Sequence, residues 1–486
     1  MTSTTSPVDH ALARQAAGVT IGALFAQRVR SGPQRTALEQ GPRRLSYARL
    51  DERSNRLCRH LMSRGIGRGE RVAILSENRL EYVELLIAAA KLGVIAACQN
   101  WRLRDEELAH CLALVTPRLI LASPRHAEAA RRCGGAVPVL TFGAEYEQAL
   151  DAAPAEPVAD HCDPEDGVVI LYTSGTTGLP KGALISQRAE IARAAIQMID
   201  LPHSADEHFV AWAPLFHMVS TDTVFMTLMQ GGKVIVTDGF DADELAAIVA
   251  RERLGRLTLM PGMITPFVDA MRRLGAPYIN SFGATETGYP PASLDTIAVG
   301  VVPTSLDKRQ SSLCRVRLVD ADDREVPDGE PGELAIRTPA LFSGYWNNPD
   351  ANREDFRGGW FHMGDVFRRN PDGTLSFVDR RKYLIKSGGE NIYPAEIERV
   401  LLAEPRVADA VVVRRPDPKW GEVPVAFVVR RDASLDADAL LALCRQHIAG
   451  YKVPREIRFV PESELPRSTT GKIMRHELEQ RLAPRV

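Results

Sequence analysis

A dense run of glycine and hydroxyl residues stands in the middle of "LYTSGTTGLPKGALIS", which occupies residues 171–186. This composition cannot fill a hydrophobic core, whereas glycines let the backbone turn and present N–H groups to an anion. A lysine follows the run and adds a positive charge. The candidate phosphate-binding residues are Thr173, Ser174, Gly175, Thr176, Thr177, Gly178 and Lys181. The pattern predicts a phosphate-binding loop directly after a buried strand.

The loop does not follow the Walker pattern of P-loop proteins. That pattern requires glycine before its lysine, where this chain has Pro180, and serine or threonine after it, where the chain has Gly182. A surface loop without function is the alternative, and the density of the run directly after an apolar strand disfavours it. The sequence therefore predicts phosphate chemistry of another kind.

Alternating helix and strand patterns surround this loop on its N-terminal side. Residues 46–65 form an amphipathic pattern with Gly65 as the expected C-cap, and residues 71–78 form a short apolar strand. Such alternation predicts a doubly wound sheet of parallel strands. The most apolar stretch, residues 85–98, is short and carries Lys91, so we expect a buried helix and strand and no membrane span.

The C-terminal third of the chain has a different pattern of polar, apolar and turn residues. Residues 314–338 and 373–380 alternate polar and apolar positions around "PDG" turns, which predicts hairpins of a small antiparallel sheet or barrel. Residues 395 onward follow a helix–strand–strand–helix–strand order, which is typical of a compact α+β domain. We therefore expect two domains, residues 1–380 and 381–486.

The composition excludes several classes of protein. The 486 residues include 60 Lys and Arg against 62 Asp and Glu, so no overall field favours nucleic acid or an anionic membrane. Seven cysteines without a CxxC pair argue against a disulfide framework and a zinc site, and fit a reducing cytosol. The N-terminus lacks the pattern of a secretory signal. We expect a cytoplasmic protein.

The phosphate loop resembles the signature motif of the adenylate-forming superfamily, which includes acyl- and aryl-CoA synthetases, peptide-synthetase adenylation domains and beetle luciferases. The other motifs of that superfamily occur here in the same order: "SFGATETG" (281–288), "GWFHMGD" (359–365), "VDRRKYLIKSGGENIYPAEIE" (378–398) and "PRSTTGKI" (466–473). The resemblance covers about residues 20–482. It implies a large α/β N-terminal domain of doubly wound parallel sheets with a small β-barrel-like subdomain, and a small mobile α+β C-terminal domain.

The resemblance assigns roles to the motif at 281–288. It implies that Glu286 holds a Mg²⁺ that bridges phosphates, that Thr285 contacts phosphate, and that Phe282 stacks on adenine. Ser281 and Gly283 of the same motif are expected at the cofactor and acyl pockets. A carboxylate framed by glycines suits Mg²⁺, although one turn carboxylate alone is more often simply solvated.

Further roles come from the remaining motifs. The resemblance implies that Asp365 and Arg380 bind the ribose, and that Lys472 is catalytic because it bridges the carboxylate substrate and the α-phosphate. A lone lysine in a polar loop is normally only solvated, but an ammonium between two anions would offset their repulsion as charge builds on phosphorus. Gly388 and Gly389 would line the pantetheine tunnel.

Two more residues complete the candidate site. Lys382 matches the hinge about which the C-terminal domain swings in the superfamily, although a charged residue at a domain junction is otherwise unremarkable. His217, in "AWAPLFHMVS" (211–220), matches a histidine beside the acyl pocket. A satisfied core histidine is an equally good interpretation of that residue.

The resemblance implies an ATP-dependent carboxylic acid–CoA ligase that uses ATP, Mg²⁺ and coenzyme A. Its partner is a small carboxylic acid of unspecified kind, and a homodimer is left open. An adenylation protein that loads a separate carrier protein is one alternative; no carrier domain is expected after residue 482. In residues 257–283 we expect a helix over 264–273 and a strand over 278–283. This segment is shorter than the superfamily pattern by about one β-α unit, on the order of 30 residues, so a non-catalytic nucleotide-binding homologue is a second alternative.

Overall fold

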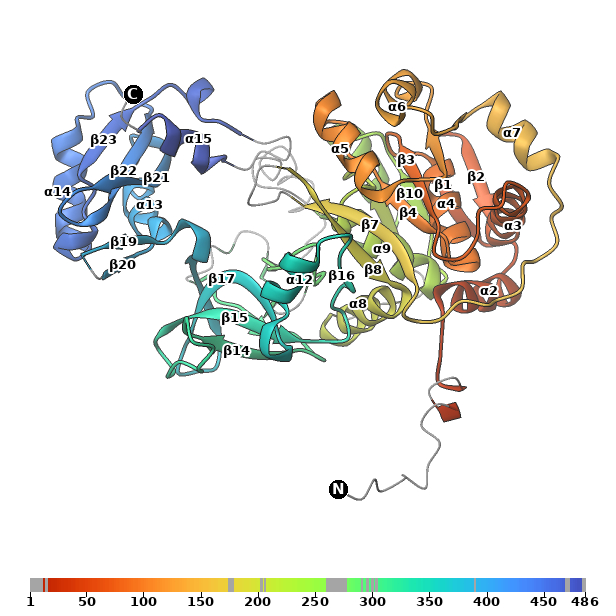
Figure 1. Cartoon of the computed structure of the whole chain (residues 1–486), viewed down its shortest axis with the longest axis horizontal. Coiled ribbons are helices and arrows are strands. Elements are labelled where there is room, and N and C mark those ends of the chain that lie inside the picture. The colour runs from red at the N-terminus through yellow and green to blue at the C-terminus, as the bar shows by residue number, and fades with distance from the viewer. Residues whose placement is uncertain are drawn as a thin grey trace. The chain divides into compact units, whose positions relative to one another are not determined.

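The computed structural model divides into two compact units. Figure 1 shows the chain coloured from red at the N-terminus to blue at the C-terminus. Unit 1 comprises Met1–Thr304, Gln310–Arg315 and Arg337–Glu354, and unit 2 comprises Ser305–Arg309, Val316–Ile336 and Asp355–Val486. The structure describes residues 12–13, 16–173, 179–201, 204, 207–258, 278–289, 292–293, 297–298, 301, 305–388, 390–467 and 473–482. Unit 2 thus holds the β-rich segment together with the C-terminal α+β region, and the expected boundary at residues 380/381 stays a prediction.

The first sheet of unit 1 is mostly parallel. Its strands lie in the order β16 (Gly344–Tyr345), β8 (Lys181–Ser186), β7 (Gly167–Thr173), β4 (Ile95–Cys98), β3 (Arg71–Leu75), β5 (Leu119–Ala122) and β6 (Val139–Thr141). The strands from β7 to β6 are parallel to one another, whereas β8 and β16 are antiparallel to their neighbours. The phosphate loop therefore connects the last parallel strand to an antiparallel one.

A second sheet of unit 1 is also mostly parallel. Its order is β11 (Leu254–Arg256), β9 (His208–Ala211), β10 (Val234–Val236), β1 (Thr36–Gln40) and β2 (Arg43–Ser46), with only β2 antiparallel. The helices of this unit include α2 (Ile21–Ser31), α3 (Tyr47–Ser63), α4 (Leu80–Leu92), α5 (Asp105–Val115), α6 (Ala127–Gly134), α7 (Ala144–Asp151), α8 (Gln187–Asp200), α9 (Met218–Gln230), α10 (Ala242–Arg251) and α12 (Pro349–Asp355). The predicted α/β class with parallel sheets is confirmed.

Local signals explain where these elements begin and end. Ser46 caps α3 by accepting a hydrogen bond from the Arg49 amide, and Gly65 adopts a left-handed conformation (φ 70°) just beyond the helix end. Strand β4 and all of helix α4 except its last residue, Leu92, are buried, as the apolar run predicted. No helix in the described part of the chain is long and apolar enough to cross a membrane.

Unit 2 begins with a four-stranded antiparallel sheet. Its order is β14 (Arg315–Val319), β15 (Pro331–Arg337), β17 (Phe361–Arg369) and β18 (Leu375–Arg380). The C-terminal region then runs through β19 (Ile385–Ser387), β20 (Glu390–Ile392), α13 (Pro394–Leu402), β21 (Val407–Asp417), β22 (Gly421–Arg430), α14 (Ala437–His447), β23 (Glu456–Phe459) and α15 (Arg475–Gln480). The predicted order of helices and strands is confirmed, with a core between α13, α14 and the sheet.

The short segment 257–283 differs from its expected structure where it is described. We expected a strand over 278–283, but Tyr278 forms only an isolated bridge with Ile297. The chain then reverses within residues 284–288, because Ala284 and Gly288 hydrogen-bond to each other across a tight turn. Residues 259–277, which include the expected helix, lie outside the described residues.

Candidate active site

The turn at residues 284–288 presents Glu286. The Gly288 amide donates to the Ala284 carbonyl at 2.8 Å, and the Ala284 amide donates to the Gly288 carbonyl at 3.0 Å. A Cβ at Gly283 would lie 2.2 Å from the Gly288 oxygen, so no other residue fits there without moving the backbone. Gly288 has a φ of 71°, which favours glycine. The glycines of the motif thus build the turn that carries the carboxylate.

A tyrosine joins this carboxylate to the phosphate loop. The Tyr345 hydroxyl donates to Oε1 of Glu286 at 2.8 Å, and Nζ of Lys181 lies 4.5 Å from the centroid of the Tyr345 ring. Lys181 begins β8, and Tyr345 pairs with Ala183 of the same strand. The structure therefore brings together two residues that the sequence singled out separately. Tyr345 belongs to none of the motifs, so the sequence alone did not single it out.

The phosphate loop itself lies at the end of β7, as predicted. Thr173, the last residue of β7, pairs with Lys181 across the antiparallel strands. Ser174, Gly175, Thr176, Thr177 and Gly178 lie outside the described residues. Their role in binding phosphate stays a prediction.

The remaining candidates of unit 1 lie near helix α9 and before the turn. His217 stands at the N-cap of α9, is half-buried, and its ring centroid lies 4.6 Å from that of Phe216. Ser281, Phe282 and Thr285 are also half-buried. Since His217 keeps part of its surface exposed, it is not a fully enclosed core residue.

The two predicted ribose ligands are neighbours in unit 2. Asp365 on β17 and Arg380 on β18 are opposite each other in the strand register, and Nε of Arg380 lies 2.9 Å from Oδ1 of Asp365. Asp365 is buried, whereas Arg380 is exposed over about two fifths of its side chain (41%). The guanidinium and the carboxylate therefore lie side by side, and their role in binding the ribose stays a prediction.

Gly388 lies against the ring of Trp420. Gly388 has a φ of 60°, its amide donates to the Trp420 carbonyl at 2.8 Å, and a Cβ there would lie 2.7 Å from the Trp420 ring. Lys382 is exposed on a short 3₁₀ turn, Arg381–Tyr383. Gly389 and Lys472 lie outside the described residues, so their predicted roles remain untested.

A buried carboxylate that the sequence did not reveal, Glu333, anchors Arg381, the residue before Lys382. Glu333 on β15 accepts hydrogen bonds from Arg381 and Arg357, each at 2.7 Å. Burial is the largest influence and raises the pKa of Glu333, but His362 and the two guanidinium groups outweigh it and lower the pKa to about 2. Arg381 is thereby tied to the sheet one residue before Lys382.

The residues present fit a Mg²⁺ that is held mainly by a nucleotide. No group of three or more His, Cys, Asp or Glu side chains suitable for a metal occurs in the described ranges. Mg²⁺ commonly takes one or two carboxylates together with phosphate oxygens and water. Glu286, oriented by Tyr345 and connected through it to Lys181, fits that mode of binding.

The fold is an α/β fold with mostly parallel sheets, and comparison with known proteins identifies the family of the chain. The sequence matches the AMP-binding enzyme family over residues 25–273 and 264–346, and the AMP-binding enzyme C-terminal domain over residues 396–472. The chain belongs to this family, the adenylate-forming superfamily. The two matching pieces overlap over residues 264–273, within the short segment 257–283.

Its relatives are CoA ligases. A feruloyl-CoA synthase of an Amycolatopsis species is 34% identical, with 95% of this chain and 99% of the relative covered. A 2-succinylbenzoate–CoA ligase of Bacillus cereus is 32% identical, covering 93% and 97%. An indoleacetate–CoA ligase of Aromatoleum aromaticum is 34% identical, covering 93% and 96%.

Solved structures agree with these relatives. The o-succinylbenzoate CoA synthetase of Bacillus subtilis, solved with its acyl-adenylate intermediate, has a TM-score of 0.82 at 26% identity, covering 95% of this chain and 98% of the other. ATP-bound MatB of Rhodopseudomonas palustris has a TM-score of 0.81 at 26% identity, covering 95% and 99%. The chain is an AMP-forming acid–thiol ligase of the acyl- or aryl-CoA synthetase type.

Proposed function

We propose that this ligase activates a small carboxylic acid that carries an aromatic ring. The three relatives described above are named for feruloyl, 2-succinylbenzoate and indoleacetate, each of which contains such a ring. His217 and Phe216, at the start of α9, supply aromatic side chains at the position where the superfamily has its acyl pocket. An aryl acid can stack on such rings.

The first step joins the acid to AMP. A carboxylate resists attack by a thiol because oxide is a poor leaving group, so a carboxylate oxygen first attacks the α-phosphorus of ATP and displaces pyrophosphate. Residues 173–181 bind the phosphates that leave. Glu286 would hold a Mg²⁺, which would supply positive charge against the phosphates. Lys472 offsets the repulsion between carboxylate and α-phosphate.

The second step forms the thioester. The thiol of coenzyme A gives its proton to solvent water, its sulfur attacks the acyl carbon, and AMP departs with the original carboxylate oxygen. A rotation about Lys382 exchanges Lys472 for the loop at Gly388 and Gly389, so one site serves both half-reactions. Asp365 and Arg380 hold the ribose in both steps.

The observation that carries this proposal is the connection from Lys181 through Tyr345 to Glu286. It puts a cation and an oriented carboxylate beside the predicted phosphate loop, where a triphosphate and its metal need both. Cytoplasmic location and a homodimer remain expectations.

The test is pyrophosphate release with ATP, Mg²⁺ and a panel of acids: ferulate, indole-3-acetate, 2-succinylbenzoate and, as an aliphatic control, octanoate. We expect release only with both ATP and an acid, and highest kcat/KM for an aryl acid. Preference for octanoate would overturn the aryl proposal. Binding of ATP without any acid-dependent release would instead favour the non-catalytic alternative.

A second assay tests whether coenzyme A or a carrier protein accepts the acyl group. With the best acid, coenzyme A is replaced by a holo-carrier protein, and thioester formation is followed by mass spectrometry. We expect the CoA thioester. A thioester formed only on the carrier would mean that the protein loads carriers.

A further inference from the structure

Arg193 of helix α8 is a fully buried cation with partners on three other segments. Its side chain has no exposed surface. Nη1 lies 3.2 Å from both carboxylate oxygens of Asp222 on α9, Nη2 donates to the Thr285 carbonyl at 2.9 Å, and Nε donates to the Ala340 carbonyl at 3.1 Å. A buried guanidinium needs such compensation, and here two of the acceptors are backbone atoms of loops.

Both loops lead to the carboxylate that we assign to Mg²⁺. The Thr285 carbonyl belongs to the peptide bond that joins Thr285 to Glu286. Ala340 lies in the loop before β16, and two residues later the Phe342 amide donates to the Glu286 carbonyl at 2.9 Å. The same loop continues to Tyr345, which donates to the Glu286 side chain. One guanidinium thus holds the two segments that together orient Glu286.

The turn also packs directly on this arginine. A Cβ added to Gly288 would lie 2.9 Å from Cδ of Arg193, so the glycine allows the turn to approach the side chain closely. Gly288 therefore meets two demands, its left-handed backbone (φ 71°) and this contact. The position of the turn depends on the position of Arg193.

Two acidic residues surround the guanidinium. Asp222 and Glu190 are both buried, with 1% of each exposed. Burial, and then the negative charge of Asp222, raises the pKa of Glu190 well above its ordinary value, and burial raises the pKa of Asp222 as well. The contact of Asp222 with Nη1 of Arg193 fixes the direction in which the guanidinium points.

We propose that Arg193, held by Asp222, is a positioning residue that sets the direction of the Glu286 carboxylate toward Mg²⁺ in the ATP site. This inference rests on the proposed role of Glu286. Mg²⁺ demands near-ideal octahedral geometry, so a small rotation of the Thr285–Glu286 peptide weakens a ligand that is otherwise intact. Arg193 acts through the two carbonyls and touches no substrate.

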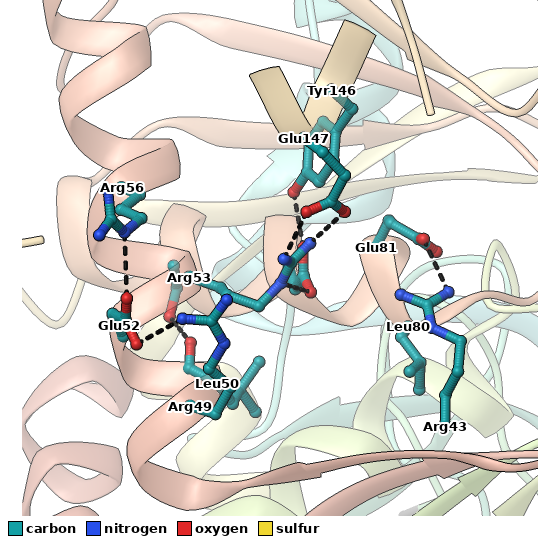
Figure 2. Close-up of polar contacts among 12 residues, drawn as sticks. Arg43, Arg49, Leu50, Glu52, Arg53, Arg56, Leu80, Glu81, Tyr146 and Glu147 are labelled. Carbon is teal, nitrogen blue, oxygen red and sulfur yellow. Dashed lines mark hydrogen bonds and ion pairs between the residues drawn. The ribbon is translucent and has the colours of Figure 1, made fainter. Parts of the chain in front are cut away.

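A buried arginine could instead serve stability alone, and the chain offers a matched control. Arg53 of α3 belongs to the same compact unit, has only 7% of its side chain exposed, and donates to Glu84 and Glu147. Figure 2 shows Arg53 pointing toward Glu147, below Tyr146. The hydrogen-bond partners of Arg53 are side chains of α4 and α7, outside the motif at 281–288.

The experiment compares Arg193→Lys with Arg53→Lys in the full chain. Lysine keeps the charge but lacks the planar fork, so it cannot bind the carboxylate and both carbonyls together. We expect both variants to lose stability in urea. Only Arg193→Lys should lower kcat for pyrophosphate release, by about 100-fold for a misplaced catalytic group. It should also raise the Mg²⁺ concentration for half-maximal activity by roughly tenfold, as loss of outer-shell support does.

A second readout does not depend on turnover. Calorimetric titration with ATP, with and without Mg²⁺, should show that Mg²⁺ strengthens ATP binding to the wild type and to Arg53→Lys, and strengthens it much less for Arg193→Lys. If Arg193→Lys does not fold, Asp222→Asn replaces it. The amide keeps the shape but not the charge, and should shift the Mg²⁺ dependence in the same direction by a smaller factor.

The outcomes separate the inference from the proposed function. An unchanged Mg²⁺ dependence in the tested variant, or an equal change in Arg53→Lys, overturns the positioning role of Arg193. A wild type that binds Mg²⁺ and ATP without acid-dependent pyrophosphate release overturns the proposed function, and the calorimetric comparison still decides the role of Arg193.

Discussion

Tyr345 and Glu286, which are 59 positions apart in the chain, are joined by a hydrogen bond of 2.8 Å from the tyrosine hydroxyl to Oε1 of the carboxylate. The donor is a neutral hydroxyl group, and the hydrogen bond restricts the rotation of the Glu286 carboxylate. A ligand for Mg²⁺ benefits from both properties, because a second-layer partner that orients the ligand commonly governs metal affinity.

Removal of this hydroxyl is the first test. Tyr345→Phe should lower kcat for pyrophosphate release by about tenfold and raise the Mg²⁺ requirement, as loss of an orienting partner does. Tyr146→Phe is the matched control, since the Tyr146 hydroxyl also donates to a carboxylate, that of the buried Glu84, at 2.8 Å. The control should lose about 1 kcal/mol of stability and keep its activity. Equal kinetics for the two variants would contradict a role of Tyr345 in the site.

The catalytic lysine can be tested by separating the half-reactions. Lys472→Ala should lower acid-dependent pyrophosphate release by about 100- to 1,000-fold, as the loss of an electrostatic group in an active site does. Conversion of a synthetic acyl-AMP and coenzyme A to the thioester should continue. Lys452→Ala, which removes a lysine paired with Glu396 at 2.8 Å, is the control and should leave both half-reactions unchanged. Normal pyrophosphate release by Lys472→Ala would refute the assignment.

The glycine beneath Trp420 should matter for the thiol step. Gly388→Ala places a Cβ in a left-handed position and 2.7 Å from the tryptophan ring, so we expect a loss of thioester formation with adenylation retained. Gly358→Ala is the control, because Gly358 has nearly the same φ (62°) but nothing within 4 Å. Both variants should lose about 1–2 kcal/mol from backbone strain. If both lose thioester formation equally, strain alone explains the effect.

Low pH should weaken the contact of Glu333 with Arg381, the residue before the predicted hinge Lys382. The pKa of Glu333 falls from 4.5 to about 2 on folding. A carboxylate whose pKa is lower in the folded than in the unfolded protein stabilises the fold at pH values above its unfolded-state pKa. This stabilisation is lost as the pH falls through the folded-state pKa. The carboxylate should therefore contribute about 3 kcal/mol at pH 7 that is lost between pH 4.5 and pH 2.

Urea unfolding of the full chain at pH 7 and pH 3 measures this contribution. Glu333→Gln should be less stable at pH 7 and should show a smaller fall in stability on acidification than the wild type. Glu330→Gln, which changes an exposed carboxylate nearby in the sequence, should behave like the wild type. An equal acid response in all three proteins would exclude Glu333 as the cause.

Much of the fold could be predicted because its signals are local. The cap at Ser46, the left-handed Gly65 and the buried runs of α4 and β4 depend on residues close together in the chain. Where the signal was not local, the prediction was wrong: the strand expected over 278–283 gives way to a bridge and a tight turn.

The sequence by itself determined the family, the order of helices and strands, and the residues of the motifs, because types and spacing within short segments carry that information. Only the tertiary structure decided which residues support the motifs. Tyr345, Arg193 and the Glu333–Arg381 pair act across 59, 92 and 48 positions of the chain. Such contacts arise only when strands and helices pack, and a buried polar group must then find its partner in space rather than in sequence.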